Sequence, residues 1–245
     1  MYPRRRFLLS TPIVPPSFFL YNGHMYGRPA AVPAYLSKAG QPGAQLPLED
    51  RNMKKKQHIW LNLVSCFLIP CYTLLFAGSI QWFSTNFSVI AVTGEDHYRG
   101  FVYWGLLAGA YFLVMLVLLA KRLPQPWARV GVFGLAVGGV LCLGYAVTIP
   151  YLPDSFPKYA ALHVLLAALA CALLMAALLL CLLVFRREDR RRWNPPLWAW
   201  LAIVGISAIL FGIPQMVSTA LEVFFTISAT LLVRDMWLRA QKDAP

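Results

Sequence analysis

Two ionisable residues, His163 and Glu222, lie inside long apolar stretches of the sequence. Charged and unpaired polar groups are costly inside a bilayer, so ionisable residues in such stretches are candidates for function. On a helix, His163 shares one face with Ala167 and Ala170, and small residues favour contact with a neighbouring helix. We therefore expect His163 to point at protein and away from lipid.

Glu222 belongs to a stripe of polar and small side chains on one helical face. The other members of this stripe are Gln215, Ser218, Thr219, Thr226 and Ala229. Tyr145, from a different apolar stretch, is expected at a similar depth in the membrane to His163 and Glu222. A hydrogen bond between His163 and Glu222 is feasible. Under one interpretation these residues line a small cavity, open to the outside, that binds a cation, a proton or a polar head group, with Tyr145, Ser218 and Thr219 as further ligand-binding candidates. Under the other, His163 and Glu222 bind each other or nearby hydroxyl groups and fix the register of the helices.

A second group of candidates lies in the longest predicted loop, where Asp96 and His97 follow Glu95. Carboxylates and imidazole bind divalent metals, which makes Asp96 and His97 secondary candidates for metal ligands. The alternative is a solvated loop, because three adjacent residues rarely point at one ion. The sequence has no H-E-x-x-H, P-loop or G-x-G-x-x-G motif, so we predict no catalytic residue and no cofactor.

The composition of the chain indicates which kind of secondary structure positions these residues. The chain of 245 residues is 59% hydrophobic and 13% charged, which is typical of an integral membrane protein. Helices satisfy their own backbone hydrogen bonds in lipid, so we predict an all-α bundle. The net charge is +12, and the basic residues lie at the ends of apolar runs and are not interleaved with stacking aromatic residues. We therefore predict no nucleic-acid partner.

Six membrane-spanning helices are predicted, at about 58–83, 101–120, 128–149, 159–185, 197–213 and 214–233. The fourth is an unbroken apolar run that, at about 1.5 Å per residue, exceeds the roughly 30 Å hydrocarbon core of a bilayer. Most Lys and Arg in the loops fall on one side of this layout, including the Arg-rich segment 186–192. Because such residues mark the cytoplasmic side, both termini are predicted to be cytoplasmic, in a bacterial cytoplasmic membrane.

Proline and glycine predict details within these spans. Pro195-Pro196 should precede the fifth span, and Pro214 should begin the sixth. The motifs Gly105-x-x-x-Gly109 and Gly134-x-x-x-Gly138 allow close approach of helices, so the second and third spans are expected to pack centrally. The segment 84–99 is expected to be the longest loop between spans.

Residues 1–52 differ from the rest of the chain. Prolines recur, periodicity is absent, and no segment can bury an apolar face, so we predict a disordered N-terminal extension. The basic run that starts at Met53 looks like the start of a bacterial inner-membrane protein, so we interpret residues 1–52 as upstream sequence translated from a misplaced start. The predicted domains are thus this extension, 1–52, and a six-span transmembrane domain, 53–245.

Three short motifs carry a resemblance to a known family. They are Asn86-Phe87-Ser88-Val89-Ile90 after the first span, Phe101-x-x-Trp104-Gly105 at the second, and the segment from Pro157 to His163 at the fourth. Over roughly Ile59 to Leu238, the chain resembles a bacterial family of six-span membrane proteins of unknown function, related to the damage-regulated autophagy modulator family. The resemblance implies a bundle of six helices with no established activity, and it supplies no catalytic residue.

The leading functional expectation is a non-enzymatic, multi-pass membrane protein. Its outward-facing pocket, containing His163 and Glu222, would bind or move a small polar or lipid-derived ligand. One alternative is a membrane-embedded enzyme that uses the same two residues as acid-base groups or metal ligands. Another is a structural subunit of a membrane complex. The expected partners are the lipid bilayer, that ligand and, for the last alternative, a second membrane protein.

Overall fold

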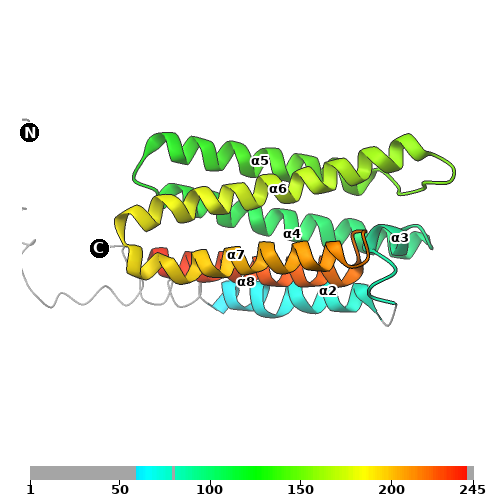
Figure 1. Cartoon of the computed structure of the whole chain (residues 1–245), viewed down its shortest axis with the longest axis horizontal. Helices are drawn as coiled ribbons and strands as arrows, with labels where there is room; N and C mark the ends of the chain where they lie inside the picture. The colour runs from blue at the N-terminus through cyan, green and yellow to red at the C-terminus, as the bar shows by residue number, and fades with distance from the viewer. Residues whose placement is uncertain (1–58, 79–80, 242–245) are drawn as a thin grey trace, which may run out of the picture. The chain divides into compact units, whose positions relative to one another are not determined.

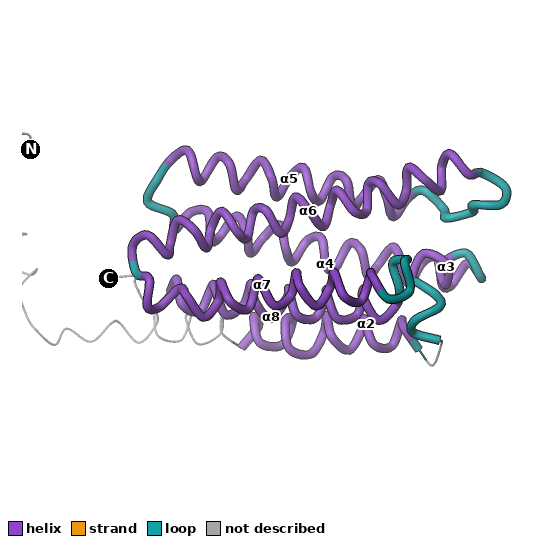
Figure 2. Tube along the Cα trace, in the orientation of Figure 1, coloured by secondary structure: helices purple, strands orange, loops and turns teal. Residues whose placement is uncertain are grey.

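The computed structural model describes residues 59–78 and 81–241, and every regular element in these ranges is a helix (Figures 1 and 2). The described residues belong to one compact unit that spans 47–245. The predicted extension 1–52 and the predicted start at Met53 lie outside the described residues.

The described part of the chain begins with a continuous helical segment, Ile59–Ala77, which contains a π-helical stretch, Val64–Leu68, followed by α2, Ile69–Ala77. A short helix, α3, follows at Phe87–Ala91. The long helices after it are α4 (Glu95–Arg122), α5 (Pro126–Thr148), α6 (Pro157–Glu188), α7 (Arg190–Gly212) and α8 (Thr219–Gln241).

Five of the helices in the described part of the chain are long and apolar enough to cross a membrane. They are Ile59–Ala77, α4, α5, α6 and α7. These helices imply a bilayer environment, because water would be a poor solvent for such apolar lengths. The last long helix, α8, carries Glu222, Arg234 and Asp235 along its length.

The segment 84–99 is not a loop throughout, contrary to prediction. It contains α3 and the start of α4, which begins at Glu95. Glu95 and Asp96 occupy the first turn of α4, where their negative charge interacts favourably with the positive end of the helix dipole. The first span ends at Ala77, earlier than predicted, because Gly78 leaves the helix with φ of 58°, a conformation that favours glycine.

Two predicted boundaries near prolines are also wrong. Pro195 and Pro196 lie inside α7 rather than before it. Proline has no N–H, so each removes the donor for a carbonyl four residues earlier. The carbonyl of Arg192 accepts instead from Nη1 of Arg239 at 3.0 Å. Pro214 lies in the turn that follows α7, and α8 begins after it.

Helix α4 is central in the bundle. It packs against α5 and α8 most extensively and also contacts α2, α3 and α6, whereas α5 packs chiefly against α4 and α6 (Figure 1). The predicted central position is therefore confirmed for the second span and wrong for the third. The reason is that the glycines of α5 do not all face protein, since the positions of a Cβ on Gly134 and Gly144 meet no atom within 4 Å.

Basic side chains gather where α4 meets α5, where α6 meets α7, and where α8 ends. We call this the basic end, and its residues are Lys121, Arg122, Arg129, Arg186, Arg187, Arg190, Arg191, Arg192 and Arg239. The guanidinium of Arg122 lies 5.7 Å from the ring centroid of Trp237, which ties α4 to α8 there. Because consecutive long helices run antiparallel, α3 and the first turns of α4, α6 and α8 lie at the other end, which we call the α3 end.

Two glycines let neighbouring helices approach closely. A Cβ on Gly105 of α4 would lie 2.8 Å from a methyl carbon of Val147 in α5, and a Cβ on Gly139 of α5 would lie 2.9 Å from Cγ of Leu174 in α6. A larger residue at either position would force the helices apart.

We expect Gly139→Ala to lower the thermal stability of the detergent-solubilised protein, by about 1–3 kcal/mol, because the added methyl group overpacks the α5–α6 interface. The matched control is Gly134→Ala on the same helix, where the methyl group has open space. The melting temperature of each variant is measured from the amount of protein that size-exclusion chromatography recovers after heating. Equal melting temperatures for the two variants would contradict the close approach.

Candidate functional site

The short helix α3 is placed by its cap and by aromatic packing. Asn86 begins it, and its side-chain Oδ1 accepts from the N–H of Val89 at 2.9 Å. Phe87 is fully buried between two rings, with centroids 5.1 Å from Phe76 and 5.0 Å from Trp104, both edge-on. The helix is thereby fixed against α2 and α4 at the α3 end.

His163 lies in the second turn of α6 and is 3% exposed. Its Nδ1 is 2.7 Å from the carbonyl oxygen of Ala146 and 2.9 Å from that of Ile149. Carbonyl oxygens only accept hydrogen bonds, so Nδ1 carries a proton. In the neutral ring Nε2 is then an acceptor, and the hydroxyl of Ser88, at 2.7 Å, donates to it. This tautomer follows from the hydrogen-bond partners.

Glu222 binds the same short helix from the other side. Its Oε2 accepts from the N–H of Phe87 at 2.6 Å. The start of α8 also holds the chain that leads into α3, since the N–H and hydroxyl of Thr219 both donate to the carbonyl of Thr85, at 2.7 and 3.0 Å. Helix α8 therefore anchors the α2–α3 connection through backbone as well as side-chain atoms.

His163 and Glu222 consequently bind adjacent residues of α3 and do not bind each other. Ser88 meets the imidazole and Phe87 meets the carboxylate. His163 thus binds a nearby hydroxyl group, as the second interpretation of these residues expects, whereas Glu222 binds a backbone N–H, which neither interpretation included. The sequence did not indicate that α3 would supply the partners.

The other predicted site residues are dispersed. Ser218 and Thr219 are fully buried at the start of α8, whereas Tyr145 is 65% exposed and does not join them. Asp96 and His97 are exposed on the first turn of α4, and Nδ1 of His97 is 2.7 Å from the hydroxyl of Thr93. Within 59–78 and 81–241, no group of three or more His, Cys, Asp and Glu side chains is placed to hold a metal ion.

The space beside His163 is a narrow slot with no room for a water molecule. We call it the His163 slot, and its lining includes Ser88, Tyr98, Phe101 and Tyr151. The ring of Tyr151 lies 5.8 Å from that of His163, measured between centroids. A polar ligand therefore has no open volume beside His163 in this conformation, and Glu222 is not among the residues that line the slot.

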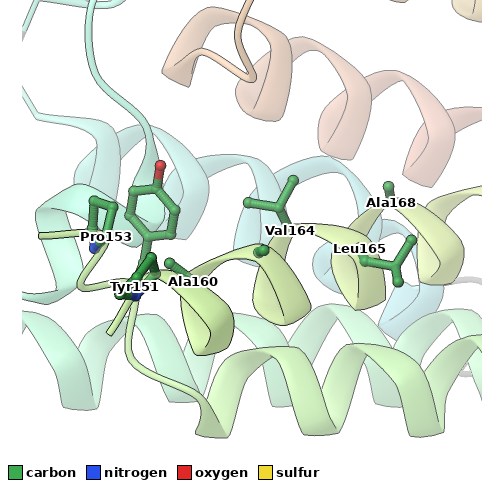
Figure 3. Close-up of a pocket in the computed structure, with 8 residues that line it drawn as sticks. Tyr151, Pro153, Ala160, Val164, Leu165 and Ala168 are labelled. Atoms are coloured by element: carbon green, nitrogen blue, oxygen red, sulfur yellow. The ribbon is translucent and has the colours of Figure 1, made fainter. Parts of the chain in front are cut away.

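A larger and more open space lies on the other side of Tyr151. This hollow, which we call the α6 hollow, has a volume of about 510 Å³. It is lined by Tyr151, Pro153, Pro157, Ala160, Ala161, Val164, Leu165 and Ala168. Figure 3 shows that its floor comes from one face of α6 and its end wall from the preceding loop. Sequence analysis did not predict this hollow, although the alanines on that face of α6 and the prolines beside it are a signal that could have indicated it.

We expect Glu222→Ala to destabilise the protein by about 1–3 kcal/mol, because it leaves the N–H of Phe87 without its acceptor. The control, Glu222→Gln, keeps an amide oxygen that can accept the same hydrogen bond and should lie close to wild type. The melting temperature reports the change in the free energy of unfolding, and hydrogen exchange of the peptide around α3 reports where the structure loosens. Unchanged exchange at α3 in Glu222→Ala would contradict the anchoring role.

No protein-family model, curated protein or solved structure matches this chain. The family resemblance therefore stays a prediction based on three short motifs. Those motifs meet at the α3 end: Phe87 packs on Trp104, Phe101 lies 6.4 Å from His163 between ring centroids, and Ser88 binds His163.

Proposed function

We propose that the chain is a six-span membrane protein with both termini in the cytoplasm and the α3 end outside. The proposal takes α8 as the sixth span. Its polar groups are bound inside the protein, since Glu222 accepts from Phe87 and Nε of Arg234 donates to Asn62 at 2.7 Å. Polar groups paired in this way are tolerated within a membrane. The concentration of Arg and Lys at the basic end supports the cytoplasmic assignment.

We further propose that the protein binds the acyl chain of a membrane lipid in the α6 hollow. The hollow carries this proposal, because its volume is in the range of small-molecule sites and its lining is almost entirely apolar. A small polar ligand has nothing to bind there. The hollow also opens on α6, the most hydrophobic of the candidate spans, so hydrocarbon is the medium that reaches it.

The length of the hollow along α6 matches the thickness of the hydrocarbon layer of one leaflet. From Pro157 to Ala168 the helix rises by about 16 Å, which is roughly half of the hydrocarbon core of a bilayer. At its outer end stand two exposed aromatic residues, Phe156 and Tyr159, with ring centroids 6.3 Å apart, as is typical of a membrane–water interface. Lys158 lies exposed between them and can pair with a lipid phosphate.

Membrane orientation can be tested with single cysteines in a variant that lacks the five native ones. We expect Asp154→Cys to react with an impermeant maleimide in intact cells, because the loop before α6 lies outside. Arg187→Cys should react only after the membrane is permeabilised. The opposite pattern would reverse the sidedness and remove the outward-facing site.

The lipid site can be tested with phosphatidylglycerol that carries a diazirine in its acyl chain. In proteoliposomes we expect crosslinks to concentrate on the peptides of α6 and the preceding loop. Ala161→Trp fills the hollow and should lower that crosslinking several-fold, whereas Ala202→Trp, at an exposed position of α7, should not. Crosslinks spread evenly over all lipid-facing helices, or unchanged by Ala161→Trp, would contradict the proposal.

A further inference from the structure

We propose that Ser88 and His163 form a nucleophile–base pair that transfers the acyl group of an ester-linked lipid. The choice of substrate rests on the proposed lipid site, whereas the chemistry rests on the geometry of the pair. An activated serine needs a base within hydrogen-bond reach and a third group that orients the base. The separation of 2.7 Å between Oγ of Ser88 and Nε2 of His163 meets the first condition.

The second condition is met by main-chain carbonyl groups. The carbonyl oxygens of Ala146 and Ile149 both lie within hydrogen-bond distance of Nδ1 of His163. They hold the imidazole in the tautomer that leaves Nε2 free to accept a proton. A negative dipole on the far side of the ring also favours the imidazolium that forms when the serine gives up its proton.

The half-buried hydroxyl of Ser88 makes a different kind of hydrogen bond from the buried hydroxyl groups of Ser65 and Thr73. Ser65 and Thr73 donate to carbonyl groups one turn earlier in their own helices, at 2.5 and 2.8 Å, which is the local bond that such residues commonly form in membrane helices. Ser88 instead binds a titratable ring 75 positions away in the sequence. Acyl transfer requires such a hydrogen bond between a nucleophile and a base, whatever their separation in the sequence.

The pair is next to the proposed lipid site. Ser88 and His163 line the His163 slot, the acyl chain would lie in the α6 hollow, and Tyr151 lines both. Rotation of this one side chain would join the two spaces and let an ester carbonyl at the outer end of the acyl chain reach Ser88. Tyr98, which also lines the slot, carries a hydroxyl that can donate to a developing oxyanion.

The chemical steps balance without a metal or a redox partner. Oγ of Ser88 attacks the ester carbonyl carbon while Nε2 of His163 takes its proton, and a tetrahedral intermediate forms. The bond to the alcohol oxygen then breaks, and His163 gives its proton to that oxygen, so a lysolipid leaves and the acyl group stays on Ser88. Water or a second alcohol attacks the acyl-serine, His163 takes the proton of this nucleophile and returns it to Oγ of Ser88, and a fatty acid or a new ester is released.

The test uses a fluorophosphonate with a long alkyl chain on the full-length protein in proteoliposomes. Attack by Ser88 forms a P–O bond and expels fluoride, and mass spectrometry locates the adduct. We expect labelling at Ser88 in the wild type, no labelling in Ser88→Ala, and labelling at least about a hundredfold slower in His163→Gln, the size of a general-base contribution. Ser84→Ala, an exposed serine of the same connection, is the matched control and should label normally.

Tyr151→Ala separates catalysis from a structural hydrogen bond. If the tyrosine closes the slot, its removal speeds labelling of Ser88, whereas a structural role for the pair predicts no such effect. Melting curves identify any variant that fails to fold, and the wild-type adduct remains decisive in that case. The absence of an adduct on Ser88 in both the wild type and Tyr151→Ala would overturn the inference, as would an adduct whose rate does not depend on His163.

The two proposals can fail separately. Diazirine crosslinks in the α6 hollow without an adduct on Ser88 would leave the lipid site standing and remove the acyl transfer. An adduct on Ser88 without crosslinks in the hollow would leave the nucleophile–base pair standing and remove the lipid site.

Discussion

The docking of α3 onto α6 and α8 is the constraint on which the rest of this end of the protein depends. A helix of five residues has no independent stability, so its position must come from its partners. Those partners are two groups that would be costly if unpaired in a membrane, the imidazole of His163 and the carboxylate of Glu222. Each forms a hydrogen bond to α3, His163 through Ser88 and Glu222 through Phe87, so that α3 joins α6 to α8.

The sequence was sufficient to predict an all-helical protein with long apolar helices, because apolar length is a local signal, but it did not predict α3. It placed His163 and Glu222 on inward faces, and His163 is buried as the spacing of its alanines indicated. It did not predict their partners, since Ser88 and Phe87 are 75 and 135 positions away in the chain. Pairing over such separations depends on how the helices pack, which the periodicity of the sequence does not indicate.

The errors at helix boundaries have the same origin. Pro195 and Pro196 are strong local signals for a helix start, yet α7 already begins before them. A guanidinium from α8 supplies the donor that Pro196 removes from the carbonyl of Arg192, so a tertiary contact outweighs a local preference. Likewise, the glycine motif of α5 indicated a central helix, but the open space at Gly134 places part of it on the outside.

The contrast between a tight polar slot and an open apolar hollow favours chemistry on a lipid over transport of a polar solute. A transport path needs a polar space that alternates between two sides, whereas the slot beside His163 is too small to hold a water molecule. In the proposed site, by contrast, lipid would reach the hollow directly from the bilayer and would need no path through the bundle. In the proposed mechanism, the side chain between the acyl chain and the half-buried Ser88 is that of Tyr151, which lines both spaces and belongs to a loop and not to a packed helix. Loop residues move at lower cost than core helices, so access to Ser88 requires a local rearrangement and leaves the bundle intact.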